Sequence, residues 1–259
     1  MTSVSDSQKK LKRNTTLSFL LLTGLAFSLS FIPVLHWPFG WMETFFHEIS
    51  HGLMAFVTGG AIKLIELNID GSGLCTSAGG IRFFVSFSGY AGSALWGALI
   101  YTMADNASTK SADRIAGFIL TLFAVTALFW ARDIVTWAIL GVMSIPFFII
   151  LKTKDFWVEK YFMQFSGLYI VCDAVRSPLN LFYGGEYSDS KTLQGLTWLP
   201  EFVWIFIWVS IGGLTLLFLL YRHILHEEKS PKELEQLAPP KQSEQMQKLK
   251  RLRQRLRKK

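Results

Sequence analysis

Charged residues are scarce in this chain. Asp, Glu, Lys and Arg make up 17% of its 259 residues, whereas hydrophobic residues make up 51%. Soluble domains average about 25% charged residues, so this composition argues against an ordinary soluble domain. It also argues against intrinsic disorder, which requires few apolar residues and much charge. With only two cysteines, a scaffold built on disulfides is excluded as well.

The net charge of +7 is confined to one end of the chain. Residues 222–259 contain twelve basic and five acidic residues, whereas residues 1–221 contain fourteen of each. The body is therefore neutral and apolar, and the basic excess belongs to a tail. We expect three parts: a basic cytoplasmic N-terminus at 1–14, a membrane-embedded domain at 15–221 and the basic tail at 222–259.

The tail contains a linker and a candidate helix. Residues 229–241 read as a linker, and Met246, Leu249, Leu252 and Leu256 then recur at helical spacing among Lys and Arg residues. This pattern predicts a short amphipathic helix that contacts anionic lipid. Nucleic acid is the competing partner for a basic stretch, but we do not expect it, because no aromatic residue is interleaved for base stacking.

Seven apolar segments are long enough to be considered as membrane helices. They are 15–35, 41–58, 82–104, 113–130, 134–151, 158–175 and 200–221. Lys and Arg precede the first segment, which we interpret as a signal anchor rather than a cleaved signal peptide, because it is longer than a usual signal and lacks a clear cleavage pattern. Arg132-Asp133 divides the long run 113–151 into a helical hairpin.

Basic residues at both ends predict that both termini are cytoplasmic, which requires an even number of crossings. One segment, either 41–58 or the 113–151 hairpin, is then not a complete crossing. The sequence predicts an all-α polytopic membrane protein with about six to seven transmembrane helices. It also predicts a β-hairpin at 61–80, because apolar and polar residues partly alternate there and Asp70-Gly71 is a turn signal. Its strand edges must be covered by protein or lie at the interface.

The second segment carries the motif His47-Glu48-x-x-His51. On a helix, four residues place the two imidazoles one turn apart on one face, where both can bind one Zn²⁺. Glu48 lies next to a ligand and can take a proton from the attacking water. A catalytic zinc site normally has a third protein ligand and an open position. Ionisable residues in so apolar a segment are costly and usually functional.

These residues resemble the site-2 protease family of membrane zinc metallopeptidases. The resemblance extends to Gly59-Gly60 and the strand-like 61–80 after the motif, and to the small-residue stretch 88–93, which in that family packs against the zinc helix. It spans roughly 40–210 and implies a divergent, short member with a metallopeptidase activity.

The third zinc ligand departs from the family pattern. The better-known members supply an Asp from a late Leu-Asp-Gly motif, which this sequence lacks. We place Asp173 first, because it ends an apolar run, and Asp189 second, since it could instead cap a helix. Asp133 adjoins Arg132, so ion pairing or capping accounts for it, and Asp70 is explained by turn chemistry.

Glu43 lies four residues before His47. It either lines the site or sits near the helix start, where the helix dipole favours an acid; we favour the second interpretation.

The predicted function is zinc-dependent intramembrane endoproteolysis of transmembrane or membrane-proximal peptide segments, with Glu48 as the general base and His47, His51 and an Asp as ligands. The alternative is a non-proteolytic membrane protein that retains the metal site for binding or regulation. A solute transporter is a third class, and it would require more intramembrane carboxylates than this chain offers.

Overall fold

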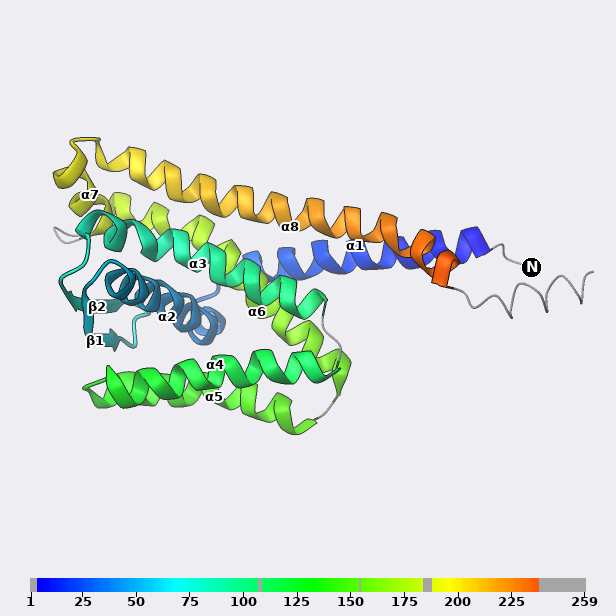
Figure 1. The fold of residues 1–259 in the computed structure, drawn as a ribbon, viewed down its shortest axis with the longest axis horizontal. Helices are drawn as coiled ribbons and strands as arrows, with labels where there is room; N and C mark the ends of the chain where they lie inside the picture. Colours follow the sequence, from blue (N-terminus) through cyan, green and yellow to red (C-terminus); the bar gives the residue numbers. More distant parts are fainter. Residues whose placement is uncertain (1–3, 107–108, 154, 184–187, 238–259) are drawn as a thin grey trace, which may run out of the picture. The chain divides into compact units, whose positions relative to one another are not determined.

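The structure is a computed structural model that describes residues 4–106, 109–153, 155–183 and 188–237 (Figure 1). The chain divides into two compact units. One contains Phe19–Leu219, and the other contains the two ends of the chain, Met1–Ser18 and Leu220–Lys259. The metal-binding motif lies in Phe19–Leu219, so the description below concerns that unit unless stated otherwise.

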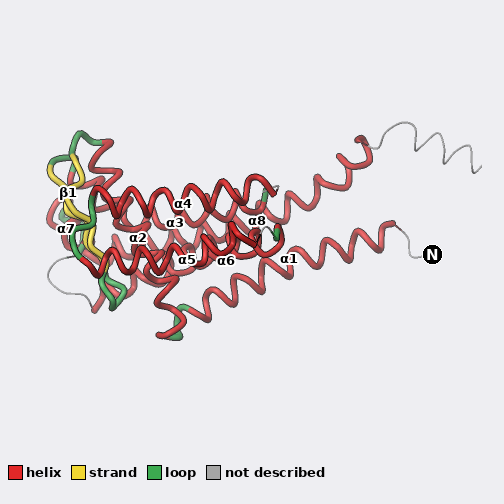
Figure 2. Tube along the Cα trace, turned by 90° about the horizontal axis from the view of Figure 1, so that it is seen from below, coloured by secondary structure: helices red, strands yellow, loops and turns green. Residues whose placement is uncertain are grey.

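Helices dominate the described residues, with one small antiparallel hairpin (Figure 2). The elements are α1 (Val4–Leu29), α2 (Pro33–Val57), β1 (Ala61–Leu67), β2 (Gly73–Ala78), α3 (Arg82–Asp105), α4 (Thr109–Phe129), α5 (Ile134–Thr153), α6 (Phe156–Arg176), the 3₁₀ helix η1 (Ser177–Tyr183), α7 (Asp189–Thr197) and α8 (Glu201–Leu237). The predicted mostly helical fold with a hairpin after the motif helix is therefore confirmed.

Helix α3 packs closely against its neighbours because small residues line its contacts. A β-carbon built on Gly97 would lie 2.7 Å from the carbonyl oxygen of Gly167 on α6, and one on Gly92 would lie 2.2 Å from Ser50 Oγ on α2. Small residues at such positions let two helix backbones approach, which is the usual basis of close packing between membrane helices. The approach fixes the motif helix against α3.

The hairpin forms where Asp70-Gly71 predicted its turn. Ala61 pairs with Ala78 and Leu67 with Gly73, and Gly71 adopts φ +89°, which favours glycine. The backbone and side chain of Ser72 donate hydrogen bonds to the Asp70 carboxylate, and these bonds lower the pKa of Asp70. Asp70 is therefore a turn residue, as expected.

The outer edge of β1 is covered by protein. The Ile65 amide donates to the Trp130 carbonyl at 3.1 Å, and the Leu67 amide donates to Thr136 Oγ1 at 2.9 Å. Both acceptors belong to the α4–α5 hairpin, whose connection contains Asp133, and Asp133 caps α5 by accepting from the Thr136 amide. The expected helical hairpin is present, and it satisfies the backbone groups of the strand edge.

Three described helices are apolar and long enough to cross a membrane: Arg82–Asp105, Ile134–Thr153 and Glu201–Arg222. Thr16–Leu29 is a shorter apolar helix. The expected count of six to seven crossings stays a prediction.

Three boundaries differ from the sequence expectations. The first helix ends at Leu29 rather than 35, the motif helix begins at Pro33 rather than 41, and α8 continues to Leu237 where a linker from 229 was expected. Proline at the first helical position accounts for the early start of α2, because it lacks only an amide hydrogen that has no helical partner there. The amphipathic helix predicted around 246–256 lies outside the described residues.

Candidate metal centre

His47 and His51 project from consecutive turns of α2, and their Nε2 atoms lie 2.9 Å apart. The Nδ1 atom of His51 lies 2.6 Å from the carbonyl oxygen of Val85 at the start of α3. Since a carbonyl can only accept, Nδ1 carries the hydrogen of this bond. In the neutral ring this tautomer leaves the Nε2 lone pair free, on the side of the ring that faces His47 and Asp189.

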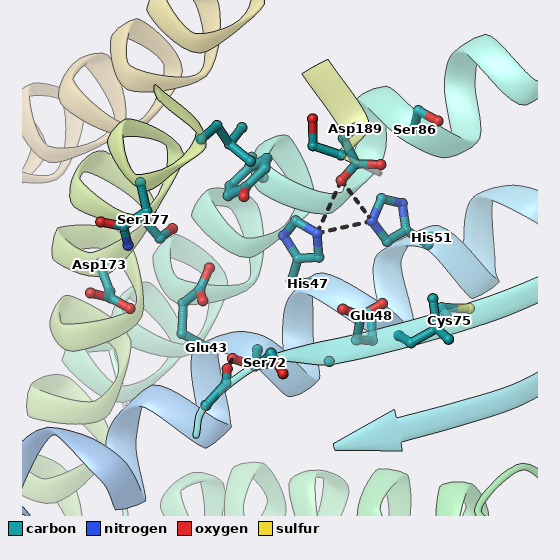
Figure 3. Close-up of a pocket in the computed structure, with 18 of the residues that line it drawn as sticks. Glu43, His47, Glu48, His51, Ser72, Cys75, Ser86, Asp173, Ser177 and Asp189 are labelled. Atoms are coloured by element: carbon teal, nitrogen blue, oxygen red, sulfur yellow. Dashed lines mark hydrogen bonds and ion pairs between the residues drawn. The ribbon is translucent and has the colours of Figure 1, made fainter. Parts of the chain in front are cut away.

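Asp189 brings a carboxylate to the two imidazoles from a distant part of the chain. Its Oδ2 atom lies 3.3 Å from His47 Nε2 and 3.2 Å from His51 Nε2 (Figure 3). Asp189 is the first residue of α7, and the helix is capped by Ser188, whose side chain accepts from the Lys191 amide. Ser188, rather than Asp189, therefore provides the cap.

Helix α7 is held in place by the start of α8. Ser190 is fully buried and its hydroxyl donates to Glu201 Oε1 at 2.6 Å. Leu193 packs in a cluster with Ala91 of α3 and with Trp204 and Trp208 of α8. The Trp208 indole also donates to the Phe87 carbonyl at 3.1 Å. These contacts set the position from which Asp189 reaches the histidines.

The arrangement suits a metal ion. With the His51 hydrogen on Nδ1, the lone pair of His51 Nε2 faces the lone pairs of the Asp189 carboxylate. A cation between these atoms removes the repulsion between them. The separations of 3.2 and 3.3 Å from Asp189 to the two histidines match the edge of about 3.3 Å in a tetrahedral site with metal–ligand distances of about 2.0–2.1 Å, and the 2.9 Å between the histidines is somewhat shorter. His47, His51 and Asp189 are a group that could hold a metal ion.

Gly89 of α3 leaves space for a metal ion between His47, His51 and Asp189. A β-carbon at that position would lie 2.5 Å from the Nε2 atoms of both His47 and His51. Any larger residue would thus fill the position where the ligand atoms converge. Tyr90, the next residue, contacts the His47 ring edge-on, with 4.4 Å between ring centroids, and keeps that imidazole in place.

The two imidazole rings favour the ionised form of the Asp189 carboxylate. Burial acts to raise the pKa of Asp189, but the interactions of its carboxylate with His51 and His47 outweigh burial and hold that pKa below its ordinary value. An ionised carboxylate is the form that binds a metal.

Glu48 is buried beside the group, and strand β2 passes close to it. A β-carbon on Gly73 would lie 2.8 Å from both Cγ and Oε1 of Glu48. The close backbone therefore confines the Glu48 side chain. Figure 3 shows its carboxylate apart from the dashed His47–His51–Asp189 contacts.

Asp173 does not belong to this group. It lies on α6, where its Oδ1 atom accepts from Nε and Nη2 of Arg176, both at 2.8 Å. An Asp and an Arg three residues apart face each other on a helix, so this pair satisfies the buried carboxylate. Of the two aspartates favoured as ligands from sequence, the structure thus brings Asp189 to the histidines and pairs Asp173 with Arg176.

The expectation for Glu43 is wrong. Because α2 begins at Pro33, Glu43 lies in the third turn rather than at the helix start, and only 5% of its surface is exposed. It faces a cavity of about 800 Å³ that also contains His47, Glu48, His51 and Asp189. Its position four residues before His47 was the signal for this interpretation, since i and i+4 share a helix face.

Sequence reasoning missed Gly73 and the Ser190–Glu201 contact, which no local pattern reveals. Gly89 was noted only as a packing residue, within the small-residue stretch.

The profile of the Peptidase M50B-like family matches residues 19–219. Comparisons with curated proteins and with solved structures gave no match. The matched range contains all the residues of the candidate metal centre and supports the resemblance to site-2 proteases drawn from the motif. The chain belongs to the Peptidase M50B-like family, which indicates a membrane metallopeptidase.

Proposed function

We propose that this protein is a zinc-dependent endopeptidase that cleaves transmembrane or membrane-proximal segments of other proteins. One observation carries the proposal: the acceptor atoms of His47, His51 and Asp189 converge in a cavity that also contains the buried Glu48. A merely structural metal site has no use for such a base. The family supports peptidase chemistry, and zinc fits the two nitrogen ligands and one oxygen ligand.

His47, His51 and Asp189 would hold the zinc ion. The bound ion supplies Lewis acidity, which polarises a peptide carbonyl and makes water easier to deprotonate. Glu48 accepts a proton from the attacking water and returns it to the leaving amine. The backbone at Gly73 limits the positions that Glu48 can adopt. The Val85 carbonyl holds the His51 ring, and outer contacts of this kind orient ligands.

The substrate would bind in an extended form. A helical substrate hides its carbonyl groups in its own hydrogen bonds, so it must unwind before reaction. Strand β2 belongs to a two-stranded sheet, and Leu74 and Cys75 of this strand line the cavity. The edge of β2 opposite β1 thus offers backbone groups to which an unwound segment could add as a further strand.

We further propose six full crossings with both termini in the cytoplasm and contact of the basic tail with anionic lipid. A cysteine introduced near residue 250, in a chain carrying Cys75→Ser and Cys172→Ser, should be labelled only from the cytoplasmic side. Labelling from outside would contradict the even number of crossings.

Glu48→Gln tests the mechanism. In detergent, the wild-type protein loaded with zinc should cleave a panel of model transmembrane peptides, and a chelator should stop cleavage. Glu48→Gln should retain its zinc and lose cleavage, because the amide cannot accept the proton. Glu66→Gln, on β1 outside the cavity, is the matched control and should remain active.

Preserved cleavage in Glu48→Gln would refute the mechanism. A zinc-loaded wild-type protein that binds peptides without cleaving any of them would favour the non-proteolytic alternative.

A further inference from the structure

The cavity has a second polar end that the proposed chemistry does not use. Glu43 of α2 faces this end, together with Asp173 and Ser177 from α6 and η1 (Figure 3). Glu43 is only 5% exposed. The buried hydroxyl of Ser93 on α3 interacts with its carboxylate, but the Oε1 atom has no hydrogen-bond partner among the described residues. A buried carboxylate oxygen without a donor is costly, so an occupant that supplies a donor would bind favourably.

The charges around Glu43 leave it as the surplus acid. Arg176 directs both Nε and Nη2 to Oδ1 of Asp173, so its positive charge is already engaged. Asp173 and Arg176 both lie close enough to act electrostatically on Glu43, with opposite signs. Burial disfavours the ionised form of Glu43, and a cation that enters this end of the cavity would favour it. The nearby His36 contacts the Tyr169 hydroxyl through its Nδ1 atom.

The distance from the metal centre follows from helix geometry. Glu43 precedes His47 by four residues on one face of α2, which is about 6 Å along the helix axis. An extended peptide rises about 3.3 Å per residue. A substrate lying along α2 with its scissile carbonyl at the metal centre would therefore place a side chain two residues away beside Glu43.

We propose that the Glu43 end of the cavity is a substrate subsite for a basic side chain, Lys or Arg, located two residues from the scissile bond. The proposal rests on the proposed peptidase function and names its substrate class. An ammonium or guanidinium group supplies the donors that Oε1 lacks and stabilises the ionised form of Glu43. An apolar side chain would leave the buried carboxylate unsatisfied, and an acidic side chain would be repelled.

The test uses quenched fluorogenic peptides in which Lys, Arg, Gln, Leu or Glu is placed at each of four positions on either side of the cleaved bond. Mass spectrometry of the products locates that bond. We expect Lys or Arg two residues from the bond to raise kcat/KM about tenfold or more over Leu, as for a hydrogen bond to a charged group. Glu43→Gln should remove this preference, and Glu43→Lys should reverse it in favour of Glu. Glu66→Gln should keep it.

Binding separates this inference from the peptidase proposal. Fluorescence anisotropy of the same peptides on Glu48→Gln, alone and combined with Glu43→Gln, reports the subsite without cleavage. Tighter binding of basic peptides that disappears with Glu43→Gln would support the subsite even if the wild-type protein cleaved nothing. Metal content and a melting curve show whether each variant is folded. If Glu43→Lys does not fold, the nearly isosteric Glu43→Gln alone tests the preference for basic peptides. An unchanged preference in folded Glu43→Gln, or no basic preference at any position, would overturn the proposal.

Discussion

Gly89 lies so close to His51 that a β-carbon on the glycine would come within 2.5 Å of the imidazole Nε2. The same is true for His47, so one methyl group would occupy the space where the ligand atoms converge. We therefore expect Gly89→Ala to weaken zinc binding by about 100-fold, at the upper end of what outer contacts to a metal contribute. Zinc content after dialysis against a graded chelator measures this effect.

Gly117→Ala on α4 is the matched control for Gly89→Ala. A β-carbon there meets nothing within 4 Å, and alanine is favoured over glycine in a helix by about 1 kcal/mol. The control should keep its zinc and gain slightly in thermal stability. Full zinc occupancy in Gly89→Ala would mean that the histidines can move aside. It would refute the role of Gly89 in leaving space for the metal ion.

Gly73→Ala should separate the base from the ligands. Its β-carbon would lie 2.6 Å from Cγ2 of Thr44 and 2.8 Å from Cγ and Oε1 of Glu48. Both side chains would have to shift, and no histidine atom is among the three nearest neighbours. We expect zinc content to stay near that of the wild type and kcat to fall by about 100-fold, the scale of a displaced general base. Thr76→Ala, an exposed position on the same strand, is the control. Loss of zinc together with activity would show that β2 supports the ligands instead.

The third ligand can be decided between the two aspartates. Asp189→Ala removes the carboxylate that lies 3.2 Å from His51 Nε2 and should abolish zinc retention. Asp173→Ala should retain zinc and lose about 1–3 kcal/mol of stability, because Arg176 then lacks its partner. Element analysis and urea unfolding of both variants measure this. The reverse pattern would assign the metal to Asp173.

The contact between α7 and α8 should tune metal affinity from outside the site. Ser190→Ala removes the 2.6 Å hydrogen bond to Glu201 and loosens the helix that carries Asp189. We expect about tenfold weaker zinc binding, because losing a contact that orients a metal ligand typically costs about 10–100-fold in metal affinity. Glu201→Gln should rescue most of the loss seen in Glu201→Ala, because its amide oxygen still accepts from Ser190. Equal affinities in Glu201→Ala and Glu201→Gln would show that the hydrogen bond has no such role.

Local patterns predicted the parts of the site that depend on near neighbours in sequence. The spacing of His47, Glu48 and His51 fixes their common helix face, and Asp70-Gly71 specifies a turn through its own backbone preferences. The divided run at Arg132-Asp133 likewise predicted the α4–α5 hairpin.

The choice between Asp173 and Asp189 depended on tertiary structure. Asp173 seemed the better candidate because its surroundings are apolar, yet the Arg176 one turn later already offered a partner. Asp189 carries no local mark of a ligand. It reaches the histidines only because α7 packs on α3 and α8, and such packing is not encoded in a short window.

The position of Glu43 was misjudged because the helix start was placed too late. The apolar segment was taken to begin at 41, whereas Pro33 opens the helix and Pro38 is accommodated within it. A boundary error of eight residues turned a buried side chain in the third turn into one at the helix end.

The ligands on α2 and α7 lie about 140 residues apart in the chain. An ion bound by all three would close that loop, and a closed loop of such length deprives the unfolded chain of much of its freedom. The metal would thus act as a reversible cross-link between the first and last thirds of Phe19–Leu219, much as a long-range disulfide does. Removing the ion would then lower the free energy of unfolding of this protein and also abolish catalysis.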